Sequence, residues 1–261
     1  MSIRRDYIDT AIGQIHYRSS GDSRLGVPLI LLHQVPSSSA MYDALLTELA
    51  EDYWMIAPDM PGFGGSDPLP GSITIEAIAK VFHEALSNLG VSQCYLFGHH
   101  TGASVAVQLE YDFPGVCKKM ALSGPTLLND SLRELLPTIS CAFPVQEDGS
   151  HLIQMWQRIR GKDNDAPLSI SQRETLLGIE LGERYPDAYM AVIAQDYATQ
   201  LAAIQCPTLI FAGTQDPLYG QLDDALALLS QGTRKEIKDG RTYGCERDAD
   251  KMAVLLKDFF Q

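Results

Sequence analysis

The feature that most constrains the fold is a short glycine- and histidine-containing run between a predicted strand and a predicted helix. Cys94–Phe97 is apolar enough for a buried strand, and Ala103–Glu110 begins a helix of small residues. Between them lies Gly98–Gly102, with the sequence Gly-His-His-Thr-Gly. Glycines on both sides of a central residue let a strand and a helix approach closely around a very tight turn. This spacing predicts that His100 is the central residue and is held at a strained backbone position.

The rest of the chain alternates between strand and helix patterns. Short, almost continuous apolar runs, typical of strands buried on both faces of a parallel sheet, lie at residues 27–33, 53–57, 94–97, 119–123 and 208–212. Apolar residues at helical spacing fill residues 41–49, 75–89, 103–110 and 252–260. Near the start, Tyr7–Tyr17 carries a turn signal at Ala11-Ile12-Gly13 and predicts an antiparallel edge hairpin. The alternation predicts an α/β fold with a mostly parallel, doubly wound sheet.

One region breaks this alternation. Residues 125–204 contain helical patches at 152–160, 171–183 and 187–201, but no convincing strand. We therefore predict a core formed by residues 1–124 and 205–261, with an inserted helical cap at residues 125–204. The cap is expected above the carboxyl edge of the sheet.

The amino-acid composition argues against some classes of binding partner. The formal net charge is −13, from 33 acidic and 20 basic side chains, which argues against nucleic acid and membrane surfaces as partners. The N-terminus lacks the apolar stretch of a secretory signal, and no run is long enough to span a membrane. The five cysteines are widely spaced, as expected of buried thiols in a reducing compartment. These features predict a cytoplasmic protein; they do not predict its oligomeric state.

Three further segments give the chain a resemblance to the α/β-hydrolase fold superfamily. Residues 31–36 (LLHQVP) lie where that family has its His-Gly oxyanion loop, and residues 59–66 (DMPGFGGS) resemble its D-x-x-G-x-G-x-S turn. Residues 206–216 (CPTLIFAGTQD) resemble the strand and loop that deliver the family's catalytic acid. The resemblance covers nearly the whole chain and implies that Asp216 is that acid.

The chain departs from this family at three positions. His100 occupies the position of the nucleophilic serine, and Gln34 replaces the glycine of the His-Gly pair. No histidine follows His151, so the family's catalytic histidine is missing. By spacing alone, Tyr243 is its predicted replacement. Ser-His-Asp chemistry in its usual form is therefore not available.

These residues suggest a site built around one imidazole. His100 is expected to act as a general base, or less readily as a nucleophile; the alternative is a decayed elbow in which it fills space. Asp216 is expected to orient and charge-stabilise His100, unless it is only a turn aspartate before a proline. The backbone amides of Val35 and Thr101 are expected to stabilise an oxyanion, and the side-chain amide of Gln34 to add a donor.

Other candidates have weaker support in the sequence. Tyr243 is expected either to donate a proton or relay to Asp216, or to be an ordinary loop tyrosine. In the cap, His151 is expected to reach the pocket from above, and Trp156 to line the cap packing or the pocket roof. Structural roles are expected for His33 and His99.

The sequence thus predicts a cofactor-free, hydrolase-type enzyme for a small, apolar carbonyl, ester or lactone substrate. No phosphate loop, metal-ligand cluster or dinucleotide fingerprint is present, so we expect no cofactor and no metal. Two alternatives stay open. One is a lyase, isomerase or decarboxylase on the same scaffold, and the other is a non-catalytic protein that binds a small ligand.

Overall fold

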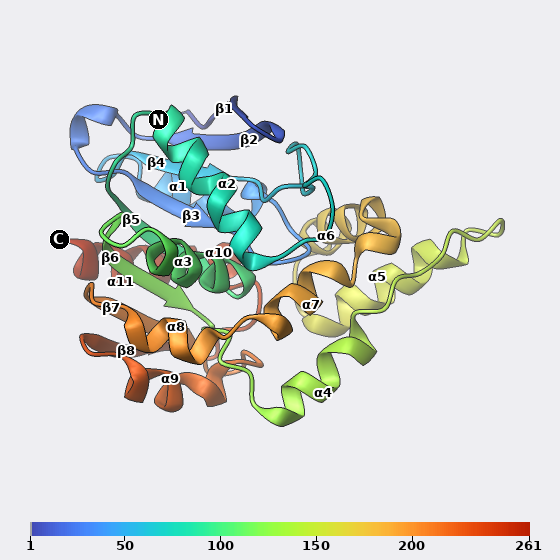
Figure 1. The fold of residues 1–261 in the computed structure, drawn as a ribbon. Helices are drawn as coiled ribbons and strands as arrows, with labels where there is room; N and C mark the ends of the chain where they lie inside the picture. The colour runs from blue at the N-terminus through green and yellow to red at the C-terminus, as the bar shows by residue number, and fades with distance from the viewer. Residues whose placement is uncertain (1) are drawn as a thin grey trace.

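An eight-stranded sheet lies at the centre of the protein, whose computed structural model describes residues 2–261 (Figure 1). The strand order is β1-β2-β4-β3-β5-β6-β7-β8. β1 and β2 pair antiparallel, β2 also pairs antiparallel with β4, and the remaining pairs are parallel. The strands are β1 Arg4–Thr10, β2 Gly13–Ser20, β3 Leu29–Leu32, β4 Met55–Pro58, β5 Cys94–His99, β6 Cys117–Ser123, β7 Thr208–Gly213 and β8 Gly232–Ile237. The predicted α/β class is confirmed.

Helices cover both faces of this sheet. One face is covered by three helices that pack together: α1 (Asp43–Glu48), α10 (Gly244–Arg247) and α11 (Ala249–Phe260). The other face is covered by four: α2 (Ile75–Asn88), α3 (Thr101–Asp112), α8 (Tyr197–Ala203) and α9 (Leu222–Leu228). Strand side chains alternate between two buried clusters: Leu31 and Phe97 belong to one, Leu32 and Leu96 to the other. Both faces are apolar, which explains the continuous apolar runs in the sequence.

α2 shows how the sequence sets a helix's limits. The Thr74 side chain accepts a hydrogen bond from the backbone amide of Ala77 at 3.0 Å and caps the N-terminus. Apolar residues at helical spacing face the sheet, and Gly90, with a φ of 74°, follows the last turn. The helix thus ends where the sequence predicts.

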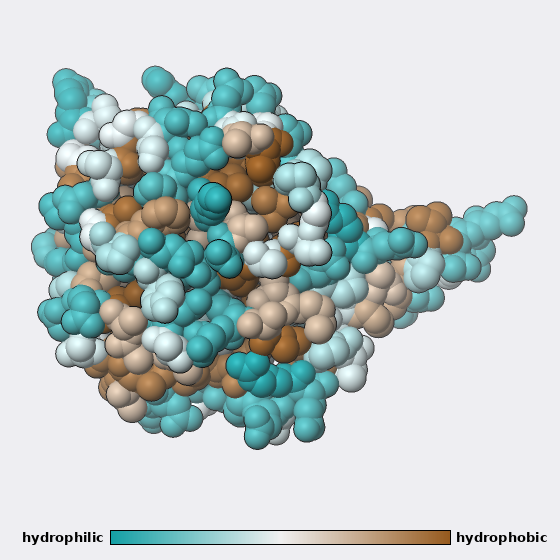
Figure 2. All heavy atoms as spheres, in the orientation of Figure 1, coloured by the Kyte–Doolittle hydropathy of each residue, from teal (hydrophilic) through white to brown (hydrophobic). Residues whose placement is uncertain are grey.

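Between β6 and β7 the chain forms helices only. They are α4 Asp130–Ile139, α5 Ser150–Lys162, α6 Leu168–Glu180, α7 Asp187–Ala194 and α8. The first four lie beside the sheet, and the connection between α4 and α5 reaches furthest from it (Figure 1). In Figure 2 this connection is an arm with a hydrophilic tip. α8 instead packs against α3, so the chain returns to the sheet face before residue 205.

Four strands and helices were absent from the predicted set: β8, α4, α9 and the single-turn α10. β8 is an edge strand whose side chains are mostly partly or fully exposed, so it lacks the apolar run that marks the inner strands. α4 contains Pro137 near its end, which weakens its helical pattern. The short 3-10 turns are η1 Ser23–Leu25, η2 Ser39–Tyr42, η3 Gly182–Arg184 and η4 Tyr219–Gln221. None of the helices described within residues 2–261 combines the length and hydropathy needed to cross a bilayer.

Candidate active site

His100 occupies the turn between β5 and α3 in a conformation that few side chains adopt. Its φ is 49° and its ψ is −114°, outside the helical and extended regions. A Cβ on Gly98 would collide with the backbone of Gly102, and a Cβ on Gly102 would collide with the Leu32 carbonyl. Both glycines are therefore needed for the close packing of strand and helix. The turn holds His100 against the carboxyl edge of the sheet.

His100 is paired with Asp216 from the loop after β7. The distance from Nε2 of His100 to Oδ2 of Asp216 is 2.8 Å, so the side chains expected to meet across the missing histidine are in contact. Asp216 is buried and also accepts a hydrogen bond from the Leu218 amide at 2.9 Å. Burial alone would raise the pKa of Asp216, but His100 favours the carboxylate and the pKa lies below its ordinary value. Asp216 is thus an ionised acceptor for the Nε2 proton.

That pairing leaves Nδ1 of His100 as the nitrogen with a free lone pair when the ring is neutral. Nδ1 has no hydrogen-bond partner among residues 2–261, and His100 lines the cavity described below. A neutral imidazole with one nitrogen held by a carboxylate and the other without a hydrogen-bond partner, in a residue that lines a cavity, can accept a proton.

Gly124, directly after β6, makes room for this pair, and the sequence analysis missed it. Its φ is 62°, and a Cβ there would lie 2.5 Å from Cδ2 and 2.8 Å from Nε2 of His100. It would also lie 3.5 Å from Oδ1 of Asp216. A signal was available: a glycine stands at the end of a predicted strand beside the strand that leads to His100.

A cavity of about 650 Å³ lies between the sheet's carboxyl edge and the helices α4, α5 and α7. The loops after five parallel strands contribute Val35, His100, Thr126, Gln215 and Thr242 to it. Its complete lining is Gln34, Val35, His100, Thr101, Thr126, Leu128, Leu132, Leu135, Leu136, Ile139, Arg158, Gly161, Lys162, Tyr185, Tyr189, Val192, Gln215, Pro217, Leu218 and Thr242. The leucine-rich wall comes from α4 and the segment before it, so this cavity suits an organic ligand with an apolar body.

Two backbone amides expected to bind an oxyanion, those of Val35 and Thr101, belong to residues that line this cavity. Neither amide donates a hydrogen bond to another residue in the described chain. Gln34 also lines the cavity, and the hydrogen bond that it makes within residues 2–261 uses its backbone carbonyl, not its side chain. The loop after β3 and the start of α3 can therefore offer free donors to an anion.

Buried hydrogen bonds support the loop that carries Val35. His33 donates from Nδ1 to the Gln34 carbonyl at 2.7 Å and accepts at Nε2 from the Met60 amide at 2.8 Å. Burial lowers the pKa of His33, so the ring stays neutral as this arrangement requires. Asp59 accepts from the Ser39 and Gly65 amides at 2.6 Å and 2.9 Å. His33 and the D-x-x-G-x-G-x-S turn therefore have structural roles.

His99 is beside His100 but does not face the cavity. Its Nδ1 lies 3.0 Å from the Ser123 hydroxyl and its Nε2 lies 2.9 Å from the Thr242 carbonyl. Burial lowers the pKa of His99 to about 3, and the nearby His100 contributes in the same direction. His99 is a neutral, fully hydrogen-bonded ring, in agreement with a structural role.

The structure does not bring three of the candidate residues to the cavity. Tyr243 is buried against Ala166 and Ile170, and its hydroxyl has no hydrogen-bond partner in the described chain; Thr242, one residue earlier, lines the cavity instead. Of these two neighbours, Thr242 and not Tyr243 therefore faces the cavity. His151 lies in the first turn of α5 and accepts from the Gln146 amide at 3.1 Å, so it closes a local turn. Trp156 is also outside the lining, because the cavity-facing side of α5 carries Arg158 and Lys162.

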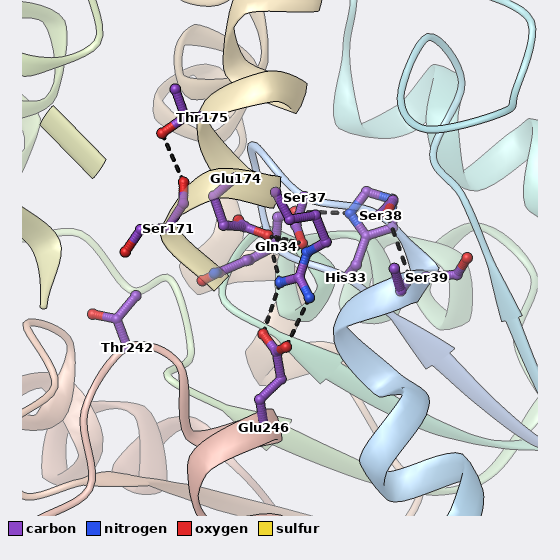
Figure 3. Close-up of polar contacts among 12 residues, drawn as sticks. His33, Gln34, Ser37, Ser38, Ser39, Ser171, Glu174, Thr175, Thr242 and Glu246 are labelled. Carbon is purple, nitrogen blue, oxygen red and sulfur yellow. Dashed lines mark hydrogen bonds and ion pairs between the residues drawn. The ribbon is translucent and has the colours of Figure 1, made fainter. Parts of the chain in front are cut away.

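Two ion clusters, both unrecognised in the sequence, join α5 and α6 to the core near this site. In the first, Arg173 bonds both carboxylate oxygens of Glu246 at 2.7 Å and also contacts Glu174 at 2.7 Å. Glu174, from α6, accepts from the Ser37 hydroxyl at 2.9 Å. Figure 3 shows Glu174 pointing toward Ser37 and Gln34, with Glu246 approaching from the core. Burial raises the pKa of Glu174 despite the opposing effect of Arg173.

The second cluster centres on Asp163, directly after α5. Its fully buried carboxylate contacts Arg241 at 3.0 Å and also pairs with Arg247. Arg241 bonds the exposed Asp165 as well, at 2.8 Å. Arg241 and Arg247, which follow β8, thus anchor the helical insertion to the core.

Comparisons with known proteins agree with this architecture. The family profile described as alpha/beta hydrolase fold matches residues 27–243. The chain belongs to this family.

Within residues 2–261, no group of three or more His, Cys, Asp or Glu side chains is placed to hold a metal ion.

Among curated relatives, the (E)-2-((N-methylformamido)methylene)succinate hydrolase of Acinetobacter baylyi is 26% identical over 205 residues. That match covers 77% of this chain and 76% of the relative. A poly(3-hydroxyalkanoate) depolymerase of Ectopseudomonas oleovorans is also 26% identical, over 90% of this chain and 84% of the relative. Such relatives support a hydrolase-type enzyme.

Solved structures resemble the whole chain. Cfl2 from Burkholderia cenocepacia has a TM-score of 0.84 at 19% identity, covering 100% of this chain and 97% of that one. The enol-lactonase from Burkholderia xenovorans has a TM-score of 0.81 at 15% identity, with 98% and 99% covered. At these identities the likeness shows the fold alone.

Proposed function

We propose that this α/β hydrolase is a cofactor-free hydrolase of small, largely apolar carbonyl, ester or lactone compounds, with His100 as the general base. The observation that carries the proposal is the 2.8 Å contact between Nε2 of His100 and Oδ2 of Asp216 beside an apolar cavity. If the turn at His100 had lost its function, no buried carboxylate would be expected in contact with His100, the side chain that replaces the serine.

The proposed reaction uses water as the nucleophile. Nδ1 of His100 takes a proton from water as the water oxygen attacks the substrate's carbonyl carbon, and Asp216 stabilises the imidazolium. The amides of Val35 and Thr101 stabilise the negative charge on the former carbonyl oxygen. When the bond to the leaving group breaks, His100 returns the proton to that group. Water is consumed and the base is restored.

The environment of His100 favours a base over a covalent nucleophile. An acyl-imidazole would need a second base to activate water for its hydrolysis. His99 is the adjacent imidazole, but both its ring nitrogens are engaged and its pKa is lowered to about 3. The curated relatives named as a hydrolase of a formamido compound and as a depolymerase of a polyester agree with carbonyl chemistry.

A lyase, isomerase or decarboxylase reaction is the second candidate. The open Nδ1 of His100 can equally take a proton from a substrate carbon or hydroxyl, and the leucine-rich cavity wall favours a substrate proton over bulk water. Reactions run in ¹⁸O-labelled water separate the two candidates. Hydrolysis places one labelled oxygen in the product, whereas deprotonation of substrate places none.

The test of the base is a panel of esters, lactones and diketones turned over by wild type, His100→Ala and His83→Ala. We expect His100→Ala to lower kcat/KM by at least about 100-fold while ligand binding, measured by calorimetry, persists. The control residue His83 stacks on Phe113 at 3.7 Å and does not line the cavity, so its variant should match wild type. Full activity in His100→Ala would overturn the assignment. A wild type that binds ligands without turning any over would indicate a binding protein.

A further inference from the structure

The charge of the cavity is opposite to that of the protein. The chain carries 33 acidic and 20 basic side chains, yet the charged side chains of the cavity lining, apart from the ionisable His100, are Arg158 and Lys162. Among residues 2–261, no aspartate or glutamate lines this cavity. Asp216 lies behind His100 and is already paired with it. The cavity therefore attracts anions although the whole protein repels them.

Lys162, the last residue of α5, has no carboxylate partner within the described chain. Its Nζ donates to the hydroxyl of Tyr189 at 3.2 Å and lies 5.8 Å from the centre of the same ring. A partly buried ammonium in an apolar cavity is costly unless a counter-charge accompanies it. Two of its three protons remain for a ligand.

The ammonium of Lys162 persists despite its surroundings. Burial disfavours the charged form, but the oxygens of Tyr189 and Tyr185 favour it more strongly, so the pKa of Lys162 lies above its ordinary value. The Tyr185 hydroxyl lies 3.4 Å from that of Tyr189, which adds a second polar group to this wall.

A hydrogen-bond relay fixes Lys162 relative to the proposed oxyanion loop. The hydroxyl of Tyr189 accepts from Lys162 and donates to the Val35 carbonyl at 3.2 Å. The ammonium is thus two hydrogen bonds away from Val35, whose amide is a proposed oxyanion donor. An anion bound by Lys162 would lie near the reacting carbonyl of the substrate.

Arg158 is held rigidly one helical turn earlier. Its guanidinium donates to the Cys141 carbonyl at 2.6 Å and lies 3.8 Å from the ring centre of Phe143. It also forms no ion pair within residues 2–261, so it adds positive charge to the cavity without neutralising Lys162.

We propose that Lys162 is a specificity-determining residue that binds a carboxylate of the substrate, with Tyr189 and Tyr185 beside it. The substrate class is then a small carbonyl-containing carboxylic acid, with its reacting carbonyl near Val35 and Thr101 and its apolar part against the leucines of α4. This inference rests on the proposed function, because it places the carboxylate in relation to that reaction centre.

The test compares the binding of three probes by calorimetry: benzoylpropionate, its uncharged primary amide, and the phosphonate analogue of the acid. On wild type we expect the carboxylate to bind about tenfold or more tightly than the amide. In Lys162→Met this preference should fall to about twofold or less. Lys118→Met removes the same charge from an exposed site outside the cavity and should keep the wild-type preference.

A second variant, Lys162→Gln, removes the charge but keeps a polar side chain, so it separates loss of the charge from loss of packing. Thermal unfolding confirms that each variant folds. Equal affinity for acid and amide on wild type, no detectable binding of either, or an unchanged preference in Lys162→Met would each overturn the subsite. Tighter binding of the phosphonate than of the carboxylate would overturn the carboxylate assignment.

The same measurements on His100→Ala separate this inference from the proposed function. If the preference for the acid persists but wild type turns no substrate over, the proposed function fails and the carboxylate subsite stands. If turnover depends on His100 but the preference is absent, the subsite alone fails.

Discussion

His100 can occupy its position only because Gly124, which lies against it, has no side chain. A Cβ on Gly124 would stand 2.5 Å from Cδ2 and 2.8 Å from Nε2 of His100, the atoms that face Asp216. The glycine directly after β6 therefore leaves the space that the imidazole occupies. The pairing of His100 with Asp216 depends on three strand ends, β5, β6 and β7.

Gly124→Ala should consequently uncouple His100 from Asp216. We expect kcat/KM to fall by about 100-fold, the scale of an ångström-sized displacement of a catalytic group, on any substrate found for wild type. The control is Gly90→Ala, where φ is 74° and no atom lies within 4 Å of the added Cβ. That variant should lose about 1 kcal/mol of unfolding free energy from backbone strain and keep its activity. Equal activity loss in both variants would contradict the steric explanation.

The sequence predicted most of the fold because the inner strands are buried on both faces and so read as apolar runs. It also led to His100 and Asp216, since both lie in segments whose local pattern resembles a known family. β8 was missed because an edge strand has no such run, and its side chains are mostly exposed.

The parts of the site that could not be predicted depend on contacts between distant segments. The position of Gly124 at the end of a predicted strand marks it as a candidate, but its contact with His100 is visible only in the structure. Nothing local to Lys162 reveals that it lines a cavity. Tyr243 was chosen by spacing, but the loop after β8 presents Thr242 to the cavity. One residue of shift along an irregular loop reverses the direction of a side chain, and only the structure resolves it.

Tyr243→Phe tests this correction directly. The Tyr243 hydroxyl is buried without a hydrogen-bond partner in the described chain, so its removal should leave the unfolding free energy unchanged or raise it by about 1 kcal/mol. Activity should stay within about twofold of wild type. Tyr189→Phe is the contrasting variant, because that hydroxyl links Lys162 to the Val35 carbonyl, and it should weaken turnover. A large activity loss in Tyr243→Phe would restore its role as proton donor or relay.

Asp59→Asn should destabilise the protein in a pH-dependent way. Burial opposes ionisation of Asp59, but His16, at 2.7 Å, and the amides of Ser39 and Gly65 outweigh it and hold the pKa at about 2, below the ordinary 3.8. Because the pKa is lower in the folded state, the carboxylate stabilises the fold above pH 4, and this contribution declines as pH falls from about 4 to about 2.

We therefore expect Asp59→Asn to lower the unfolding free energy by about 2 kcal/mol at neutral pH, measured by urea denaturation. The deficit relative to wild type should shrink steadily below pH 4. Asp258→Asn, at an exposed position with no side-chain hydrogen bond in the described chain, should show almost no deficit at any pH. If the deficit for Asp59→Asn stays constant down to pH 2, the turn is stabilised by the fit of the Asp59 side chain and not by its charge.

Asp163→Asn should loosen the helical insertion from the core. The carboxylate of Asp163 is fully buried between Arg241 and Arg247, each about one-third exposed. Its loss leaves Arg247 without its carboxylate and leaves Arg241 with only the exposed Asp165. Solvent reaches both guanidinium groups, so we expect a cost of about 1–2 kcal/mol of unfolding free energy, less than for a fully buried pair.

Hydrogen exchange should accelerate in α5 and α6 of Asp163→Asn while the amides of β5 stay protected, because the Asp163 ion cluster joins the insertion to the core without supporting the sheet. Asp165→Asn removes the exposed partner of the same Arg241 and should cost less than about 0.5 kcal/mol. Uniform acceleration across the insertion and the sheet would mean that the two unfold as one cooperative unit, and that the ion cluster is not a separate anchor.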